Sequence, residues 1–198
     1  MNREAWLNAL ARELRPLFAE NGKPIPDNVR ITCGWPSKGA LALKSQRIGE
    51  AWDNANSADL HAEIFISPIL ADTMRVADVL AHELVHVAVG NKAGHKGPFR
   101  QLALAIGLEG KMTATVAGEG FKQRVQPMLT ALGDYPHAVL TGTAPHRKQT
   151  TRLLKVMCAD CGYIARVTKQ WLESAGAPIC PIHGEAMICP DDTTEESE

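Results

Sequence analysis

Apolar residues recur at helical spacing in three stretches of the chain. From residue 2 to 20, an amphipathic pattern that includes Trp6, Leu10 and Leu14 predicts a helix. The same spacing continues from about residue 72 to Gly90, and glycine is typical of the end of a helix. A third helix is expected from about Pro98 through FRQLALAIGL. The pattern therefore predicts a mainly helical domain.

Two short apolar runs, VRITCGW and HAEIFISP, are typical of strands. We expect the polar stretch between them, SQRIGEAWDNANSADL, to be a hairpin or a loop. The segment from the third helix to about residue 145 is punctuated by Pro and Gly, which indicates irregular structure. The expected fold class is α+β, with a mainly helical domain and a short sheet in residues 1–145, a small module in 146–190, and an acidic disordered tail in 191–198.

Length and composition favour a globular protein of the cytoplasm. A chain of 198 residues can bury one sizeable core, and no apolar run approaches the ~18 residues that span a membrane. The N-terminal stretch lacks the unbroken apolar core of a signal peptide. Four of the five cysteines lie between positions 158 and 189, at spacings typical of metal sites rather than of a disulfide framework.

Charge is distributed unevenly along the chain, although the net charge is −1. Six basic residues and one acid lie between Thr143 and Trp171, whereas six acids and no base follow from Glu185. This pattern favours a polyanion such as DNA, bound without reading its sequence, although a linker and a disordered tail explain it equally well. The residues expected to contact phosphates are Arg147, Lys148, Arg152, Lys155 and Arg166.

The second predicted helix carries His82, Glu83 and His86 in the pattern HExxH. Histidines four residues apart project from one face of a helix, about 6 Å apart, so both imidazoles can bind one zinc ion. Glu83 would lie beside the open side of the metal, where it can take a proton from an attacking water molecule and deliver it to a leaving amine. The pattern predicts a catalytic zinc site with Glu83 as its general base.

His95 is the expected third ligand of this site. It follows Gly94, after a stretch that leaves the helix at Gly90, so the chain can fold back toward the metal. Without a third histidine, the HExxH histidines would be equally well explained as ordinary core or surface residues. The alternative third ligands are His61, His137 and Glu119.

These motifs resemble the SprT-like domain, the family that contains the Spartan-type DNA-dependent metalloproteases. In the metzincin pattern the third histidine would stand where this chain has Lys92. The chain instead has GHKGPF directly before a helix, similar to the glycine-histidine-glycine element of the family, with Lys96 inserted. The resemblance covers roughly residues 60–105 closely and the rest of 1–145 by general layout, and it implies a zincin fold.

The zincin fold suggests further roles for residues near the cleft. An edge strand of a zincin can pair with an extended substrate, and EIFISP is our candidate for that strand. Met112 could lie beneath the metal as in a Met-turn, although a single core methionine explains it as well. Nothing in the sequence identifies the group that stabilises an oxyanion. The candidates, each also explained by a structural role, are Arg100, Tyr135 and His137.

The C-terminal cysteines form the pattern C-x2-C followed by C-x2-H, which matches zinc-ribbon spacing with a histidine in the place of the commoner fourth cysteine. Four protein ligands fill the coordination shell, so this zinc would be structural and would contribute much of the stability of so small a module. Cys189 is the alternative to His183 as fourth ligand. The expected ligands are Cys158, Cys161, Cys180 and His183.

Together, the motifs predict a zinc metalloendopeptidase with one catalytic and one structural Zn²⁺. A zincin followed by a zinc ribbon is also seen in SprT-like proteins, and the resemblance implies substrates associated with DNA. Because no apolar run is long enough to span a membrane, we expect no membrane partner. The alternative is a nucleic-acid-binding or regulatory protein that keeps a catalytically silent zincin scaffold. Glu83 argues against that alternative, because a purely structural site has no need of a carboxylate beside an open metal position.

Overall fold

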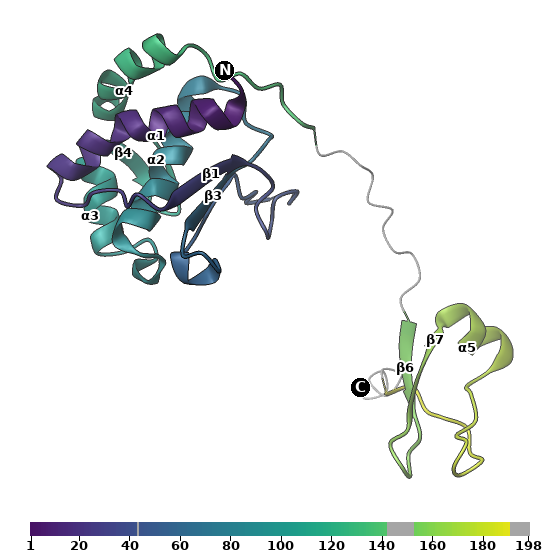
Figure 1. Cartoon of the computed structure of the whole chain (residues 1–198). Helices are drawn as coiled ribbons and strands as arrows, with labels where there is room; N and C mark the ends of the chain where they lie inside the picture. The colour runs from purple at the N-terminus through teal and green to yellow at the C-terminus, as the bar shows by residue number, and fades with distance from the viewer. Residues whose placement is uncertain (43, 142–152, 191–198) are drawn as a thin grey trace, which may run out of the picture. The chain divides into compact units, whose positions relative to one another are not determined.

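The computed structural model describes residues 1–42, 44–141 and 153–190. The chain divides into two compact units, one within Met1–Gly142 and one within Thr143–Glu198, and each is described by itself (Figure 1). Helices and small sheets both contribute, which confirms the predicted α+β class. Among the described residues, no helix combines the length and the apolar character needed to cross a membrane.

Three of the helices in the first unit stand where the apolar spacing predicts them. They are α1 (Arg3–Glu20), α2 (Thr73–Val89) and α3 (Pro98–Ala105). Side chains cap the first two, because Asn2 accepts a hydrogen bond from the amide of Ala5 and Asp72 accepts one from the amide of Arg75. Local sequence signals therefore fix where these helices begin.

A fourth helix, α4 (Glu119–Leu132), lies in the segment predicted to be irregular, so that prediction is wrong. Glycine near its start and Pro127 inside it hide the helical pattern. Its buried residues Phe121, Val125 and Leu129 are spaced four apart and join the main core. Burial of this face outweighs the weak local propensity.

The same segment contains a hairpin formed by β4 (Leu108–Lys111) and β5 (Ala114–Ala117), which the sequence also did not indicate. Each strand has only four residues, and most of them are exposed. The hairpin packs against α2 through β5. It therefore gives α2 a second β-sheet neighbour besides the main sheet.

The main sheet has the strand order β1-β3-β2. The predicted strands are confirmed as β1 (Val29–Cys33) and β3 (Ala62–Ile66), which pair in parallel. The antiparallel partner of β3 is β2 (Gly49–Trp52), which falls in the stretch predicted to be a hairpin or a loop. Because β3 is the central strand and both its edges are paired, the prediction that EIFISP is a substrate-pairing edge strand is wrong.

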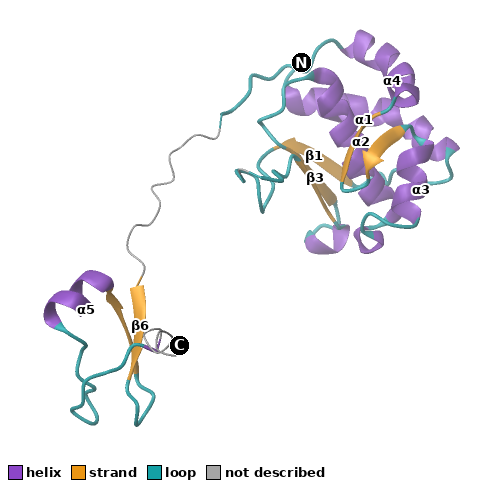
Figure 2. Ribbon diagram, turned by 180° about the vertical axis from the view of Figure 1, so that it is seen from behind, coloured by secondary structure: helices purple, strands orange, loops and turns teal. Residues whose placement is uncertain are grey.

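One face of this sheet forms part of the core. Ile31, Cys33, Ile64 and Ile66 are buried there, and helices α1 and α2 pack against the strands (Figure 2). The opposite face carries alternate residues that stay partly exposed, among them Phe65. The sheet therefore separates the helical core from a second, open surface.

The second unit is a small module built on one hairpin. Strand β6 (Leu153–Met157) pairs with β7 (Ile164–Thr168), and the short helix α5 (Lys169–Ala175) follows. Among the described residues of this unit, the buried side chains are few: Val156, Cys158, Cys180 and Met187. So small a core leaves much of the stability to other interactions.

Candidate metal centres

The structure gathers the imidazoles of His82, His86 and His95 around one point at the surface of α2. His86 Nε2 lies 3.1 Å from His95 Nε2, which lies 3.3 Å from His82 Nε2. Ligands at the zinc–nitrogen distance in a tetrahedral shell are about 3.3 Å apart. The three nitrogen atoms therefore fit a tetrahedral zinc ion with one position left for another ligand.

Glycines bring His95 back to the helix that carries the other two histidines. Gly90, at φ 83°, ends α2, and the short 3₁₀ helix η2 (Asn91–Ala93) follows. Gly94, at φ 55°, then directs the chain toward the helix. Such angles strain residues that have a Cβ, so glycine permits the return that places His95.

Phe99, the aromatic residue at the end of GHKGPF, supports all three imidazoles from one side. Its ring centroid lies 4.9 Å from that of His82, 4.4 Å from that of His86 and 4.9 Å from that of His95. The side chain is fully buried at the start of α3. It therefore ties the positions of the three histidines to the hydrophobic core.

A hydrogen-bond network orients His82. Its Nδ1 lies 2.8 Å from Thr115 Oγ1 in β5, so the other ring nitrogen points toward the metal position. Arg75 donates to Thr115 O and to Asp78, and the buried Asp78 accepts a hydrogen bond from the amide of Ala117. Sequence reasoning missed this network, because nothing in the sequence pairs α2 with β5.

The environment keeps the three histidines neutral. Burial, with a smaller contribution from the neighbouring imidazoles, lowers the pKa of His82 to about 3. Burial also lowers the pKa of His86 to about 4 and lowers that of His95. Neutral imidazole is the form that binds a metal ion, so the site is ready for one near neutral pH.

Glu83 lies beside the histidines with its side chain buried against β2. A Cβ at Gly49 would lie 2.8 Å from Val79 Cγ1 and would overlap the Glu83 carboxylate, so the absence of a side chain at Gly49 makes room for Glu83. Burial raises the pKa of Glu83 to about 8, with Arg47 acting in the opposite direction and Glu50 adding to the rise. A cation bound at the histidines would favour the ionised carboxylate.

The histidines and Glu83 open into a cleft of about 730 Å³. Its walls are α2, the segment from Ser45 to Ala51 that includes the start of β2, and the tip of the β4–β5 hairpin at Thr113–Thr115. Within the described part of the chain, the residues lining this cleft include Arg47 but none of Arg100, Tyr135 and His137. Arg47 lies in the polar stretch predicted to be a hairpin or a loop, and no motif marks it.

Strand β2 presents a free edge along this cleft. The amide of Ser67 donates to Ile48 O, so Ile48 directs its backbone groups toward the chain that continues β3. In an antiparallel pair every second residue does the same, so the backbone N–H and C=O groups of Glu50 and Trp52 also point toward β3. The backbone groups of Gly49 and Ala51 then face away from the sheet. Ala51 O accepts a hydrogen bond from Asn91 Nδ2, while the Gly49 groups and the Ala51 amide lie at the open edge.

The other predicted ligands and oxyanion candidates lie elsewhere. His61 Nδ1 is 3.0 Å from Asp59 O, His137 Nε2 is 2.8 Å from Pro68 O, and Glu119 is exposed at the start of α4. Tyr135 packs on Trp6, and Arg100 is exposed on α3. Met112 is partly buried and packs against the main core. The structure therefore brings only His95 of these residues to His82 and His86.

The second candidate centre lies in the C-terminal unit. Cys161 Sγ is 3.7 Å from Cys180 Sγ, and His183 Nδ1 lies 3.6 Å from Cys158 Sγ and 3.9 Å from Cys180 Sγ. Zinc–ligand bond lengths in a tetrahedral shell give separations of about 3.5–3.8 Å, so these four side chains also fit zinc. The described group does not include Cys189, which packs beside the small core.

Two similar turns build this cysteine–histidine group. The amide of Gly162 donates to Cys158 O, and the amide of Gly184 donates to Cys180 O. Both glycines have positive φ, 72° and 70°, which suits tight turns after each pair of ligands. Each turn therefore brings two ligands to the same side of the chain.

Among the residues predicted to contact phosphates, Lys155 and Arg166 face each other across β6 and β7. Arg147, Lys148 and Arg152 lie outside the described residues. Two like charges opposite each other in a hairpin repel, and a bound anion would relieve that repulsion.

Comparisons with protein families, curated proteins and solved structures find no match to this chain, so the two centres have to be interpreted from their own geometry.

Proposed function

We propose that this chain is a zinc-dependent metalloendopeptidase of the SprT-like type, acting on proteins associated with DNA. The observation that carries the proposal is the spacing of the nitrogen atoms of His82, His86 and His95 beside the buried carboxylate of Glu83, in a cleft. Three protein ligands leave a coordination position open, which is typical of catalytic zinc and not of structural zinc.

Each group in the cleft has a role in peptide hydrolysis. A zinc ion held by the three histidines would act as a Lewis acid on a water molecule and on the carbonyl of the substrate. The Glu83 carboxylate accepts the proton of the attacking water and passes it to the leaving amine. The free edge of β2 would hold an extended substrate through the backbone groups of Gly49 and the amide of Ala51.

The second unit would localise the enzyme. A zinc ion held by its three thiolates and one imidazole would have no open coordination position and would serve the fold of this unit. Lys155 and Arg166, together with the three basic residues before β6, would bind phosphates of DNA without sequence preference. Substrates bound or crosslinked to DNA would then be brought close to the cleft.

The decisive experiment compares wild type with Glu83→Gln, both loaded with zinc and incubated with a DNA-binding protein, with and without single-stranded DNA. Wild type is expected to cleave, and faster with DNA, because DNA concentrates enzyme and substrate together. Glu83→Gln keeps the shape of the side chain but cannot accept the proton, so cleavage should fall by at least a hundredfold.

Two results would contradict the proposal. Equal cleavage by both proteins would assign the activity to another base or to a contaminant. Zinc-loaded, DNA-binding wild type that cleaves nothing would favour a nucleic-acid-binding protein with a silent zincin scaffold. Zinc content measured on the same samples ensures that a loss of metal does not imitate the loss of Glu83.

A further inference from the structure

The open face of the main sheet carries a second hollow, on the side away from the helical core. It has a volume of about 320 Å³, and we call it the aromatic pocket. Register places Trp52 beside Glu63 and Glu50 beside Phe65, so all four lie on this face. Three aromatic side chains and three carboxylates dominate its lining: Trp35, Trp52, Phe65, Glu50, Asp53 and Glu63.

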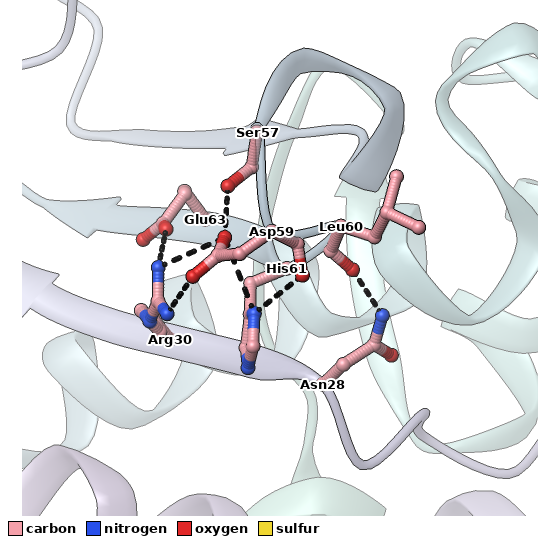
Figure 3. Close-up of polar contacts among 7 residues, drawn as sticks. All are labelled: Asn28, Arg30, Ser57, Asp59, Leu60, His61 and Glu63. Carbon is pink, nitrogen blue, oxygen red and sulfur yellow. Dashed lines mark hydrogen bonds and ion pairs between the residues drawn. The ribbon is translucent and has the colours of Figure 1, made fainter.

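The charge around the aromatic pocket is negative. Arg30, from β1, is held between Asp59 and Glu63, as Figure 3 shows. Arg47 forms an ion pair with Glu50. Within the described residues, no cation lies within ion-pair distance of Asp53.

Among the described residues, the four carboxylates on this surface have only two guanidinium groups as ion-pair partners, besides the imidazole of His61 beside Asp59. Arg30 is engaged by two acids, so it cannot cancel both charges. The lining itself contains no lysine or arginine among the described residues. An anion such as a phosphate would be repelled here, whereas a cation would meet both carboxylates and aromatic faces.

We infer that the aromatic pocket binds the side chain of a lysine or arginine that belongs to the polypeptide lying along β2. Tryptophan faces attract ammonium and guanidinium groups through the ring quadrupole, and the carboxylates add charge attraction. The long methylene stems of these side chains can at the same time cover the apolar parts of Trp35 and Phe65.

Strand β2 contributes residues to both the aromatic pocket and the cleft. Gly49 and Ala51 alternate along the strand with Glu50 and Trp52, which lie on the pocket face. A polypeptide paired with the free edge of β2 extends the sheet, so its side chains alternate between the same two faces. This inference rests on the proposed function, because it assigns the pocket to the substrate of that cleft.

The test measures binding rather than cleavage, with the zinc-loaded full chain carrying Glu83→Gln. The probes are a labelled peptide in which lysine alternates with alanine and the same peptide with glutamine in place of lysine. Two variants alter the pocket: Trp52→Leu removes an aromatic face, and Asp53→Asn removes a charge but keeps the acceptor for the amide of Ala55. The matched controls are Asp27→Asn and Trp171→Leu, which remove an exposed carboxylate and an exposed tryptophan elsewhere.

We expect the lysine peptide to bind more tightly than the glutamine peptide, and each pocket variant to weaken lysine-peptide binding by about threefold to tenfold. The control variants should leave that affinity unchanged. Equal affinity for both peptides, or equal losses in pocket and control variants, would overturn the inference. Lysine-dependent binding through Trp52 and Asp53 without any cleavage by wild type would support the pocket and overturn only the protease assignment.

Discussion

Thr115 is the residue through which the fold controls the orientation of His82. Its hydroxyl holds Nδ1 of the imidazole, and its backbone carbonyl is held by Arg75. Such partners of a metal ligand fix the ring and raise its basicity. Thr115 lies 33 positions from His82 in the sequence, so only the tertiary structure reveals the pair.

Replacing Thr115 by valine should weaken zinc binding at the histidines by about tenfold to a hundredfold. Thr115→Ser keeps the hydroxyl and should bind zinc nearly as tightly as wild type. Competition with a chromogenic chelator measures both affinities, and zinc bound at the cysteine–histidine group would provide an internal reference. Equal affinities in all three proteins would show that this hydrogen bond does not support the site.

Gly49 is needed because the Glu83 carboxylate occupies the space that a side chain would fill. Gly49→Ala should lower the free energy of unfolding by about 1–3 kcal/mol through overpacking, and should reduce cleavage by displacing Glu83. Gly120→Ala is the matched control, because a Cβ there meets nothing within 4 Å and alanine favours the helix. Urea unfolding compares the two, and unchanged stability of Gly49→Ala would contradict the packing argument.

At the scale of elements, the sequence predicts what depends on local pattern. The helix carrying His82, Glu83 and His86 has regular apolar spacing, so its position and the spacing of its ligands follow from the sequence. Strand β2 has four residues and no apolar alternation, and it exists because β3 pairs with it. The cleft wall, Arg47 and the aromatic pocket depend on that pairing, so none of them could be predicted.

Strand β3 shows a related limit of prediction from sequence. Its apolar pattern predicts a strand correctly, but a pattern of period two does not say whether both edges are paired. Likewise α4 is defined by burial of Phe121, Val125 and Leu129 against distant residues, and its Gly and Pro obscure the pattern. Elements whose stability comes mainly from tertiary packing cannot be predicted from the local sequence pattern.

The fourth ligand of the cysteine–histidine group can be tested by paired substitutions. His183→Ala should reduce the zinc content by one ion per chain and unfold the hairpin of β6 and β7, because the small core cannot hold it without metal. Cys189→Ser should keep both zinc ions, since Cys189 lies outside the group. Zinc analysis together with limited proteolysis checks both variants, and the opposite pattern would make Cys189 the ligand.

At the scale of the whole molecule, the two units differ in the size of their cores and in the candidate metal site that each one carries. The first has a large continuous core formed by four helices and two sheets. The second has few buried residues in its described part, and the basic residues lie in its strands or just before them in the sequence. The DNA binding proposed above can therefore be tested separately for each unit, by truncation and by charge removal.

A fragment ending at Gly142 should fold, keep zinc at the three histidines and cleave an unstructured peptide, but lose stimulation by single-stranded DNA.

Five phosphate contacts on single-stranded DNA give a slope of about −3.5 when the logarithm of the binding constant is plotted against that of salt concentration. Removing Lys155 and Arg166 together, as Lys155→Gln and Arg166→Gln, should reduce the magnitude of that slope by about 1.4. Fluorescence anisotropy at several salt concentrations measures it, with Lys23→Gln and Lys38→Gln as a charge-matched control in the first unit. An unchanged slope in the Lys155 and Arg166 variant would exclude this hairpin as the DNA-binding surface, because counterion release depends on the charges that contact phosphate and not on net charge alone.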